Sequence, residues 1–365
     1  MIIGDVLAPH LVKWSRALFA AGIDLYLWSL NKPEKADYED ELLARISSPG
    51  IYVDANKEGT MGKLGYLKQL GHLRQTIQRF RPDILHAHYA TSYGLLGAMS
   101  GVKNFIISVW GSDVMSFPGK SPIHRFLLRK VLNRAAQVQA TGEFLRKITE
   151  QFTDKVKVVN FGLENSFFSR NPVKVTGVVP EIVIGSVKSL ESHYRIDVLI
   201  KAFAIAKKKS EVSQNLKLLI VGDGALKSDL QKLSVQEGIS DEVEFTGRQP
   251  YSTIADFHRR MDIHVCTSER ESFGVSILEA MALGIPVICS DIPAFDELVT
   301  DGVTGLRFRQ GEPDNLAAKI LSLINNDALK QSLLTHAAER AQYYKLNRCV
   351  TLQIETYRSL LSKRV

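Results

Sequence analysis

The chain has 365 residues, and because domains average about 150 residues we expect two of them, each with its own core. Hydrophobic residues make up 45% and charged residues 23% of the chain, which excludes collagen, a long coiled coil and extended disorder. The formal net charge is +7, from 46 Lys and Arg against 39 Asp and Glu. A basic chain can meet nucleic acid, an anionic membrane or a phosphorylated substrate.

The positive charge is confined to the first part of the chain. Residues 1–170 hold 22 Lys and Arg against 15 Asp and Glu, whereas the remaining residues hold 24 of each. We therefore expect any anionic partner to meet the N-terminal part. Nucleic acid is not expected, because no basic platform interleaved with aromatic residues and no helix-turn-helix pattern is present in the sequence.

The cysteines favour a reducing compartment. Cys266, Cys289 and Cys349 are odd in number, far apart and without C-x-x-C spacing, so neither a disulfide framework nor a thiolate zinc site is expected. No run approaches 18 apolar residues, and the N-terminus has no pattern of a secretory signal. We expect a cytoplasmic protein that does not span a membrane.

Short apolar, β-branched runs alternate with helix-like stretches along the first part of the chain. Continuous apolar character is typical of parallel strands that are buried on both faces. Two of the helix-like stretches, 63–81 and 121–135, combine an apolar stripe with several basic residues, as in helices that pack on a core or touch anionic lipid. The expected strands lie within 23–28, 82–88, 104–111, 135–142 and 155–162.

The same alternation restarts after residue 180. The stretch 166–180 contains two prolines and no helical period, which predicts a linker between a domain at 1–165 and a second domain at 181–345. Both domains are therefore expected to be α/β units with parallel sheets. The expected strands of the second lie within 181–187, 216–224, 241–247, 261–268 and 285–291.

The densest motif lies at 269–308. It starts in an acidic loop and enters a helix predicted from about Gly274 to Leu283. A helix that starts at a Gly offers free backbone N–H groups and a positive dipole end, which favour a phosphate. Glu271 and Glu279 are eight residues apart, with the first before the helix and the second inside it.

This stretch resembles the C-terminal signature of the family-four (group 1) retaining glycosyltransferases. The resemblance is carried by the E-x7-E spacing, the ESFG entry, EAMALGIPVI and the later DGVTGLRF. It implies the GT-B fold, in which two Rossmann-like domains have parallel sheets that face each other across a cleft. It also implies that a C-terminal helix at about 346–365 packs back on the first domain.

The resemblance implies a nucleotide-sugar site in the second domain. The family holds the diphosphate with a basic residue after the first strand and a Lys six residues later. Lys188 matches the first position, but Tyr194 stands at the second, so Arg195 or His193 could supply the missing charge. The donor contacts that the resemblance implies are Lys188, Arg195, Gly247, Arg248, Glu271, Ser272, Phe273, Gly274, Val275 and Glu279.

The first domain is similar to the acceptor side of the same family. His88 matches the histidine that faces the donor sugar. We expect His86 and His88 to point in opposite directions, with His86 in the packing. Asp113 either binds the acceptor hydroxyl or caps the following turn, and both readings stay open. His10 is expected to lie beside the acceptor.

The resulting hypothesis is a retaining transferase that moves a sugar from a UDP- or GDP-sugar to a hydroxyl of a glycan or lipid-linked acceptor. Glu271, His88 and Lys188 are the expected catalytic residues, and the family implies no obligatory metal or other cofactor. A sugar-nucleotide epimerase and a non-catalytic sugar-nucleotide-binding subunit are the alternatives. The basic N-terminal domain favours a protein that is peripheral on the inner face of an anionic membrane.

Overall fold

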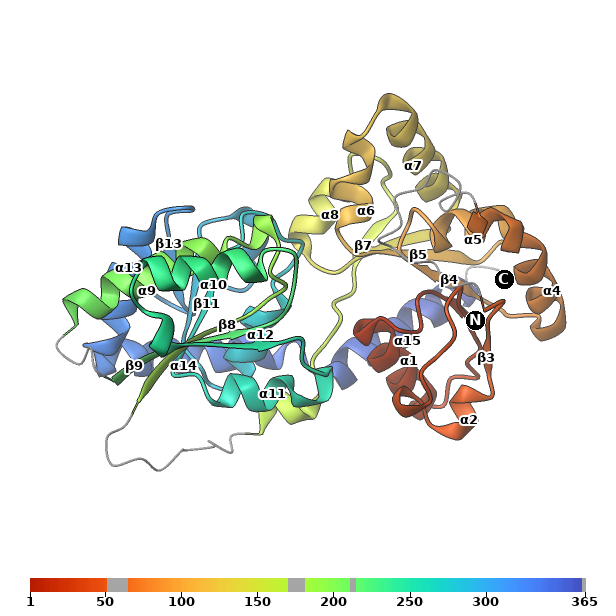
Figure 1. Ribbon diagram of the computed structural model, residues 1–365. Helices are drawn as coiled ribbons and strands as arrows, with labels where there is room; N and C mark the ends of the chain where they lie inside the picture. The colour runs from red at the N-terminus through yellow and green to blue at the C-terminus, as the bar shows by residue number, and fades with distance from the viewer. Residues whose placement is uncertain (51–64, 170–180, 211–214, 363–365) are drawn as a thin grey trace. The chain divides into compact units, whose positions relative to one another are not determined.

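The computed structural model describes residues 1–50, 65–169, 181–210 and 215–362, and these form two compact units. Unit 1 comprises Met1–Gly162 together with Leu346–Val365, and unit 2 comprises Leu163–Lys345. Figure 1 shows each unit as a sheet covered by helices. The expected linker at 166–180 begins inside unit 2, and residues 170–180 lie outside the described part of the chain.

The division into units sharpens the charge asymmetry. Unit 1, with its C-terminal segment, carries 25 Lys and Arg against 15 Asp and Glu, a net charge of +10. Unit 2 carries 21 against 24, a net charge of −3. The C-terminal segment thus adds to the basic excess of the unit that it joins.

Unit 1 is built on a parallel sheet that has seven strands among the described residues, in the order β3-β2-β1-β4-β5-β6-β7. Alternate residues of its strands enter two cores. Ile3 and Trp28 belong to the larger core, whereas their neighbours Ile2 and Leu27 belong to the smaller one. The strands are β1 (Ile2–Ile3), β2 (Leu27–Trp28), β3 (Ile46–Ser47), β4 (Leu85–His88), β5 (Phe105–Val109), β6 (Gln137–Ala140) and β7 (Val156–Val158).

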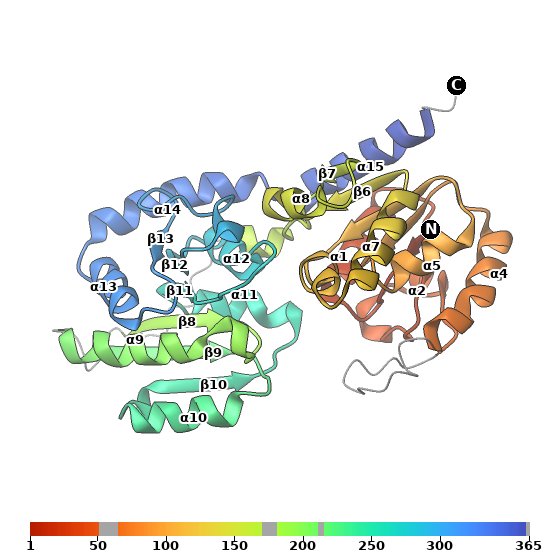
Figure 2. The same cartoon turned by 90° about the horizontal axis from the view of Figure 1, so that it is seen from above.

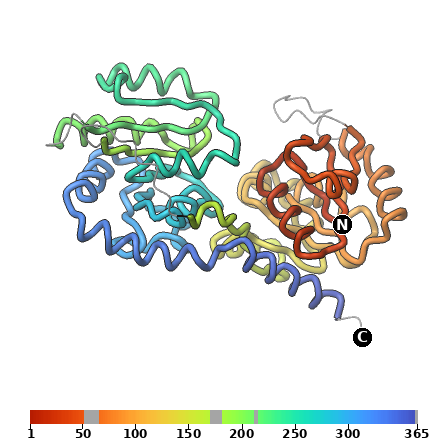
Figure 3. Tube along the Cα trace, turned by 90° about the horizontal axis from the view of Figure 1, so that it is seen from below, coloured from red at the N-terminus to blue at the C-terminus, as the bar shows by residue number. Residues whose placement is uncertain are grey.

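The helices of unit 1 cover both faces of this sheet. The α5 helix packs against α4 and α7, and α1 packs against α15, which runs beside it in Figure 3. The C-terminal segment 346–362 is therefore helical and belongs to the smaller core of unit 1. The helices are α1 (Pro9–Ala20), α2 (Asp40–Leu43), α4 (Leu70–Phe80), α5 (Tyr93–Ser100), α6 (Ser112–Met115), α7 (Pro122–Arg134), α8 (Glu143–Thr149) and α15 (Leu346–Ser362).

Unit 2 repeats this plan with six parallel strands within its described residues, in the order β10-β9-β8-β11-β12-β13. Strands β8 and β9 pair over six residues each, from Ile182 opposite Leu216 to Val187 opposite Val221. Their apolar runs are buried on both faces, as expected of a parallel sheet. The strands are β8 (Ile182–Val187), β9 (Leu216–Val221), β10 (Val243–Gly247), β11 (Ile263–Cys266), β12 (Val287–Ser290) and β13 (Leu306–Phe308).

The helices of unit 2 form two layers. The α9 helix packs against α10 and α13, whereas α12 packs against α11 and α14, and Figures 1 and 2 show the sheet between these groups. The helices are α9 (Ile196–Lys209), α10 (Lys227–Gln236), α11 (Tyr251–Arg259), α12 (Val275–Ala282), α13 (Pro313–Ile324) and α14 (Asp327–Gln342).

The strands confirm the expected α/β rhythm, since each of the ten expected runs contains a strand. The run 23–28 forms a strand only at Leu27–Trp28, and β1, β3 and β13 are not among the expected runs. The expected helix at 121–135 is α7. The expected helix at 63–81 is a 3-10 turn at Tyr66–Gln69 followed by α4, and its residues 63 and 64 lie outside the described part.

Cys266, Cys289 and Cys349 are buried free thiols. No helix in the described residues has both the length and the apolar character needed to cross a bilayer.

Candidate functional site

The donor-side residues lie at one edge of the unit 2 sheet. Strand β8 is followed by helix α9 and then β9 on one side, and it is flanked by β11 on the other, so the connections leave this edge in opposite directions. Such a switch point is where open parallel sheets bind ligands, beyond the carboxyl ends of the strands. Lys188 follows β8 directly, and the loop with Glu271 follows β11, so this edge holds both.

Two glycines after β9 hold the Lys188 loop in place. A Cβ at Gly222, where φ is +147°, would lie 1.8 Å from the Lys188 carbonyl oxygen, and a Cβ at Gly224 would lie 2.7 Å from that of Leu190. Backbone hydrogen bonds connect the loop to this turn. The Lys188 amide donates to the Val221 carbonyl (3.0 Å), and the Leu190 amide donates to the Asp223 carbonyl (3.0 Å). The Gly-Asp-Gly turn therefore supports the Lys188 loop by close backbone approach.

Lys188 is a buried cation that meets two partners. Its ammonium forms an ion pair with the Glu271 carboxylate, and it lies 4.9 Å from the centre of the Tyr194 ring. Both charged side chains are only 12% exposed. Although burial disfavours the charged form, Glu271 raises the pKa of Lys188 above its ordinary value. Tyr194 stands at the position where the resemblance implies a second lysine. Its ring instead lies against the ammonium of Lys188.

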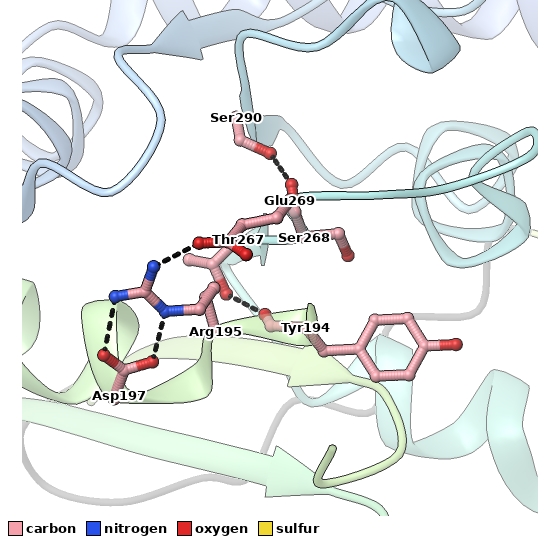
Figure 4. Close-up of polar contacts among 7 residues, drawn as sticks. All are labelled: Tyr194, Arg195, Asp197, Thr267, Ser268, Glu269 and Ser290. Carbon is pink, nitrogen blue, oxygen red and sulfur yellow. Dashed lines mark hydrogen bonds and ion pairs between the residues drawn. The ribbon is translucent and has the colours of Figure 1, made fainter. Parts of the chain in front are cut away.

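Arg195 is committed to carboxylates. Its guanidinium holds Asp197 through two hydrogen bonds of 2.9 and 3.0 Å and also pairs with Glu269. Figure 4 shows this side chain pointing to Asp197 and Glu269, with the Tyr194 ring directed the opposite way. Arg195 has a left-handed backbone (φ 50°) at the start of α9. Its expected role on the phosphates stays a prediction, and in the structure it ties the loop after β8 to the loop after β11.

Further hydrogen bonds reinforce the same two loops. Thr267 donates its hydroxyl to the Tyr194 carbonyl (2.8 Å), and the Glu269 amide donates to the His193 carbonyl (2.8 Å). Ser290, at the end of β12, donates to the Ser268 carbonyl (Figure 4). The loops that carry Lys188 and Glu271 are therefore fixed relative to each other within unit 2.

A cavity of about 630 Å³ lies on the outer side of this cluster. Arg195, Glu269 and His193 line it, together with residues of α10, but Lys188, Glu271 and Glu279 do not. Its lining has acidic and basic side chains in similar numbers, many already paired with one another. The expected donor contacts Lys188 and Glu271 therefore lie outside this cavity.

Helix α12 starts as the sequence predicts. Gly274 has φ +99°, and a Cβ there would lie 2.9 Å from the Phe295 ring, so the turn into the helix requires glycine. Phe273 is buried against Tyr344 with ring centres 5.5 Å apart, whereas Ser272 and Val275 are half-buried. The Ile277 amide donates to the Gly274 carbonyl (3.1 Å), which leaves the amides of Val275 and Ser276 as the first-turn N–H groups that can meet an anion.

Glu279 is buried on α12, where it is 4% exposed. Its Oε2 lies 3.2 Å from Nε2 of His258, a fully buried residue of α11. The ring of His264 lies 5.1 Å from that of His258, and burial followed by the charges of His258 and Lys188 holds the pKa of His264 well below its ordinary value. His258 thus positions the carboxylate of Glu279, one of the expected donor contacts.

Gly247 and Arg248 lie at the end of β10. The carbonyl of Gly247 accepts a hydrogen bond from Gly222 (3.0 Å), which joins this strand end to the Gly-Asp-Gly turn. Gly247 has φ +72°, and Arg248 is exposed. Both residues therefore lie beside the turn that supports Lys188.

In unit 1, His86 and His88 lie on the same face of β4, with ring centres 4.4 Å apart. The expectation that they point in opposite directions is wrong, because residues two apart on a strand share a face. His86 is in the packing, where its nitrogens meet the Tyr357 hydroxyl (2.7 Å) and the Ser108 hydroxyl (2.8 Å). The nitrogens of His88 have no hydrogen-bond partner among the described residues.

His88 is neutral. Burial lowers its pKa to about 3, so the ring carries no charge near neutral pH. It lies edge-on to Trp110, with ring centres 5.9 Å apart. A neutral imidazole with free nitrogens can donate or accept a hydrogen bond to a sugar hydroxyl.

Aromatic rings continue from His88 to His10. The His10 ring stacks on Phe161 with centres 4.5 Å apart, and Trp110 stands edge-on to both rings. Lys13, one helical turn further on, donates to the Gly162 carbonyl (2.7 Å) and is buried. His88 and His10, both expected on the acceptor side, are thus connected through the Trp110 ring.

Asp113 is fully buried and accepts backbone hydrogen bonds from Ala90 (2.8 Å), Gly111 (2.9 Å) and Trp110 (3.1 Å). Burial raises the pKa of this carboxyl despite these bonds. Asp113 does not cap the following turn, because α6 starts after Gly111 without a side-chain cap and the amides that Asp113 accepts from all precede it. Its expected role on the acceptor hydroxyl stays a prediction. Asp113 joins the loop after β4 to the loop after β5.

Several residues of the site were not identified from the sequence. His258 precedes Glu279 by 21 residues, Phe161 follows His10 by 151 residues, and neither spacing matches a local motif. The contact between Tyr194 and Lys188 could have been found from the sequence, since an aromatic residue six positions after a lysine can reach it across a turn.

Comparison with known proteins places these features in a family. Residues 171–342 match the family model of group 1 glycosyl transferases, and residues 1–142 match that of glycosyl transferase 4-like domains. The chain is 27% identical to N-acetyl-alpha-D-glucosaminyl L-malate synthase of Bacillus anthracis, over 78% of this chain and 76% of the relative. It is 26% identical to D-inositol 3-phosphate glycosyltransferase of Jonesia denitrificans, over 95% of this chain and 89% of the relative.

The fold is also similar to that of solved glycosyltransferase structures. The crystal structure of Anabaena HepE in complex with UDP and glucose superposes with a TM-score of 0.79 at 19% identity, covering 98% of each chain. Two parallel sheets, the two family models and this superposition agree, and the chain is a group 1 glycosyltransferase with the GT-B fold.

Proposed function

We propose that the protein transfers a sugar, with retention of anomeric configuration, from a nucleoside-diphosphate sugar to a hydroxyl of a glycan or lipid-linked acceptor. The observation that carries this proposal is the buried ion pair of Lys188 and Glu271 at the switch point of unit 2. Burying two charges costs free energy, so a pair held this tightly at a ligand-binding edge favours a functional role.

The donor diphosphate lies against Lys188 and the start of α12 in this proposal. Glu271 keeps Lys188 protonated, and Tyr194 confines its ammonium from the other side. Glu279 accepts a hydrogen bond from the ribose, while Gly247 and Arg248 lie beside the base. UDP-sugars are the donors to test first, because HepE, with the same fold, binds UDP and glucose.

The reaction breaks the bond between the anomeric carbon and the diphosphate oxygen. The acceptor hydroxyl oxygen forms the new bond from the same face, and its proton passes to an oxygen of the leaving diphosphate. Negative charge develops on that diphosphate, so Lys188 and the N–H groups of α12 stabilise the transition state. His88, being neutral, orients the sugar through a hydrogen bond. This chemistry asks for no metal ion from the protein.

The acceptor is anionic in this proposal. The names of two relatives contain an acidic molecule, L-malate in one and D-inositol 3-phosphate in the other. Unit 1, which carries the acceptor-side residues, has a net charge of +10. A cytoplasmic enzyme at the inner face of an anionic membrane would meet such an acceptor, free or linked to lipid.

The test uses Lys188→Ala and Glu271→Gln, assayed with a panel of UDP- and GDP-sugars. Each variant should lower kcat by about 100-fold or more, since Lys188→Ala removes the cation that stabilises the leaving group and Glu271→Gln removes the carboxylate that holds this cation in place. Lys201→Ala, an exposed position on α9, is the matched control and should keep full activity. Full activity in a Lys188→Ala, Arg195→Ala double variant would contradict the assignment of the phosphate site.

The same panel separates the two other functions considered. An epimerase would convert a UDP-sugar with no acceptor present, and a non-catalytic subunit would bind nucleotide without turnover. Membership of a glycosyltransferase family favours neither.

A further inference from the structure

Helix α7 has a second apolar face that stays exposed among the described residues of unit 1. Leu128, Val131 and Leu132 face the core and are buried. Ile123 and Phe126, in contrast, are 76% and 62% exposed, which are among the highest values for large apolar side chains in the described residues, and Leu127 is 37% exposed.

These exposed residues share one side of the helix with cations. Positions 123, 126, 127, 130 and 134 follow the i, i+3, i+4, i+7 and i+11 spacing of a single helical face. Ile123, Phe126 and Leu127 form its first half, and Lys130 and Arg134 form its second half. Lys130 lies 5.4 Å from the centre of the Phe126 ring, so the two halves touch. We call these five residues the outer face of α7.

The surroundings of this face carry only positive charge in the sequence. No Asp or Glu occurs between Asp113 and Glu143, whereas Lys120, Arg125, Arg129, Lys130 and Arg134 lie in that interval. Within the described residues, none of these five cations forms an ion pair with a carboxylate. Arg125 instead lies over the Phe152 ring, and Arg129 donates to the Gln151 carbonyl.

The helix is firmly held, so the outer face is a fixed feature of unit 1. Pro122 occupies its first turn, and the Ser121 hydroxyl caps its start by accepting from the His124 amide. Lys155 donates to the carbonyls of Asn133 and Ala135 at its other end (3.0 Å each). Figure 1 shows α7 at an edge of unit 1.

We propose that the outer face of α7 docks on an anionic lipid surface. Ile123, Phe126 and Leu127 enter the boundary between headgroups and acyl chains, and Lys130 and Arg134 meet lipid phosphates. A lipid surface fits better than a protein partner. Three apolar side chains on one helix cover far less area than a stable protein interface needs, whereas a membrane needs only shallow insertion plus charge attraction.

This inference does not depend on the donor site. It concerns a surface of unit 1, and it is measured without donor or acceptor. It does bear on the acceptor, because α6, which contains Asp113, leads to α7 through a 3-10 turn at Phe117–Gly119. Docking through α7 would therefore hold the acceptor-side loop close to the lipid.

The experiment is co-sedimentation of the full chain with vesicles of phosphatidylglycerol and phosphatidylcholine in equal parts, and with vesicles of phosphatidylcholine alone. The wild type should pellet with the anionic vesicles only, and salt should weaken this binding. The double variant Ile123→Asp, Phe126→Asp should lower the vesicle partition coefficient by about tenfold or more, because two inserted side chains become charged.

Matched control substitutions on the surface of unit 2 are measured in the same vesicle assay. Val235→Asp changes an apolar side chain that is 65% exposed on α10, and it should bind vesicles as the wild type does. A charge variant, Lys130→Gln with Arg134→Gln, should bind several-fold more weakly. Its control, Lys208→Gln with Lys209→Gln on α9, should show no such loss.

Three results would overturn the proposal. One is unchanged vesicle binding in the Ile123→Asp, Phe126→Asp variant, and another is equal pelleting with neutral vesicles. The third is a wild-type dimer that this variant converts to a monomer without any vesicle binding, which would make the face an interface between two copies. Nucleotide binding and circular dichroism of each variant show that it is folded, so a failure here is distinguishable from a failure of the donor site.

Discussion

Units 1 and 2 share the strand order of a Rossmann-like sheet but hold their site residues by different forces. In unit 2 the site is a network of charges, in which Lys188, Glu271, Arg195 and Glu269 pair across two loops. In unit 1 the site is a row of rings, in which His10 and the neutral His88 meet Trp110. The net charges are also opposite, +10 against −3.

The difference follows from what each unit is proposed to bind. A diphosphate needs cations at fixed positions, and a cation in a buried loop needs a carboxylate to keep it charged. A sugar hydroxyl needs a neutral hydrogen-bonding group against a flat apolar wall. Unit 1 can therefore have a neutral site within a basic surface, while unit 2 has a charged site within an acidic one.

We expect the largest effect from a substitution that displaces the backbone of the Lys188 loop in unit 2. In Gly222→Ala the new Cβ would lie 1.8 Å from the Lys188 carbonyl at φ +147°, so the loop must move. We expect a loss of at least about 3 kcal/mol in the unfolding free energy of unit 2. Nucleotide binding measured by calorimetry should also be lost.

The control for this variant is Gly238→Ala. That position has φ +71° but nothing within 4 Å of the added Cβ, so it carries the backbone strain without the clash. Wild-type nucleotide affinity in Gly222→Ala would show that the turn does not support Lys188.

The second effect is a pH dependence of unit 1. The folded-state pKa values of His88, about 3, and of His86 lie below the usual value near 6.5. Below that pH the unfolded chain binds protons that the folded unit does not. Stability therefore falls as the pH drops from about 6.5 towards 3, by up to about 1.4 kcal/mol per pH unit for each histidine.

This dependence can be followed in unit 1 alone. The chain has three tryptophans, Trp14, Trp28 and Trp110, and all are in unit 1. Denaturant unfolding monitored by tryptophan fluorescence at several pH values should give a smaller slope in His88→Gln. His336→Gln, on the surface of unit 2, should leave the slope unchanged. Equal slopes in wild type and His88→Gln would mean that His88 is not kept neutral by burial.

A third, smaller effect concerns Asp113. Asp113→Ala leaves two buried N–H groups and one partly buried N–H group of unit 1 without their acceptor and should cost about 2 kcal/mol of unfolding free energy. The same fluorescence measurement reports it. Asp154→Ala, at an exposed position, serves as control. A variant with wild-type stability but no transfer would instead favour a role on the acceptor hydroxyl.

The smallest expected effect tests whether His258 of unit 2 acts on donor binding rather than on the chemical step. His258→Leu removes the hydrogen bond to Glu279, and we expect the donor KM to rise about tenfold while kcat changes less, since the lost bond acts on ribose binding. His258→Gln, which keeps a donor, should recover part of the affinity. A fall in kcat with an unchanged KM would contradict the positioning role.

The sheets could be predicted because buried parallel strands appear as continuous apolar runs. The two-residue strands β1 to β3 mark where this signal ends, since their pairing depends on neighbours rather than on a run of their own. Strand β3 (Ile46–Ser47) has only one large apolar residue, and no pattern in the sequence distinguishes it from a loop.

The site could be predicted where residues adjoin in sequence and not where they meet across loops. The Gly274 helix start is local and was predicted. The pairing of Arg195 with Glu269 joins residues 74 positions apart, so no local pattern predicts that carboxylates hold this arginine. The two histidines of β4 could have been placed correctly, since strand periodicity alone puts them on one face.

The last helix has a consequence for how the protein folds during synthesis. Tyr357 supplies the hydroxyl that meets His86, and Cys349 and Val350 belong to the core of unit 1, yet all three are made after the whole of unit 2. Unit 2 is one continuous stretch of chain and can fold as it leaves the ribosome. Unit 1 cannot complete its core, or the packing around His86 and His88, until α15 has left the ribosome. The unit that is translated first is therefore the unit that is completed last.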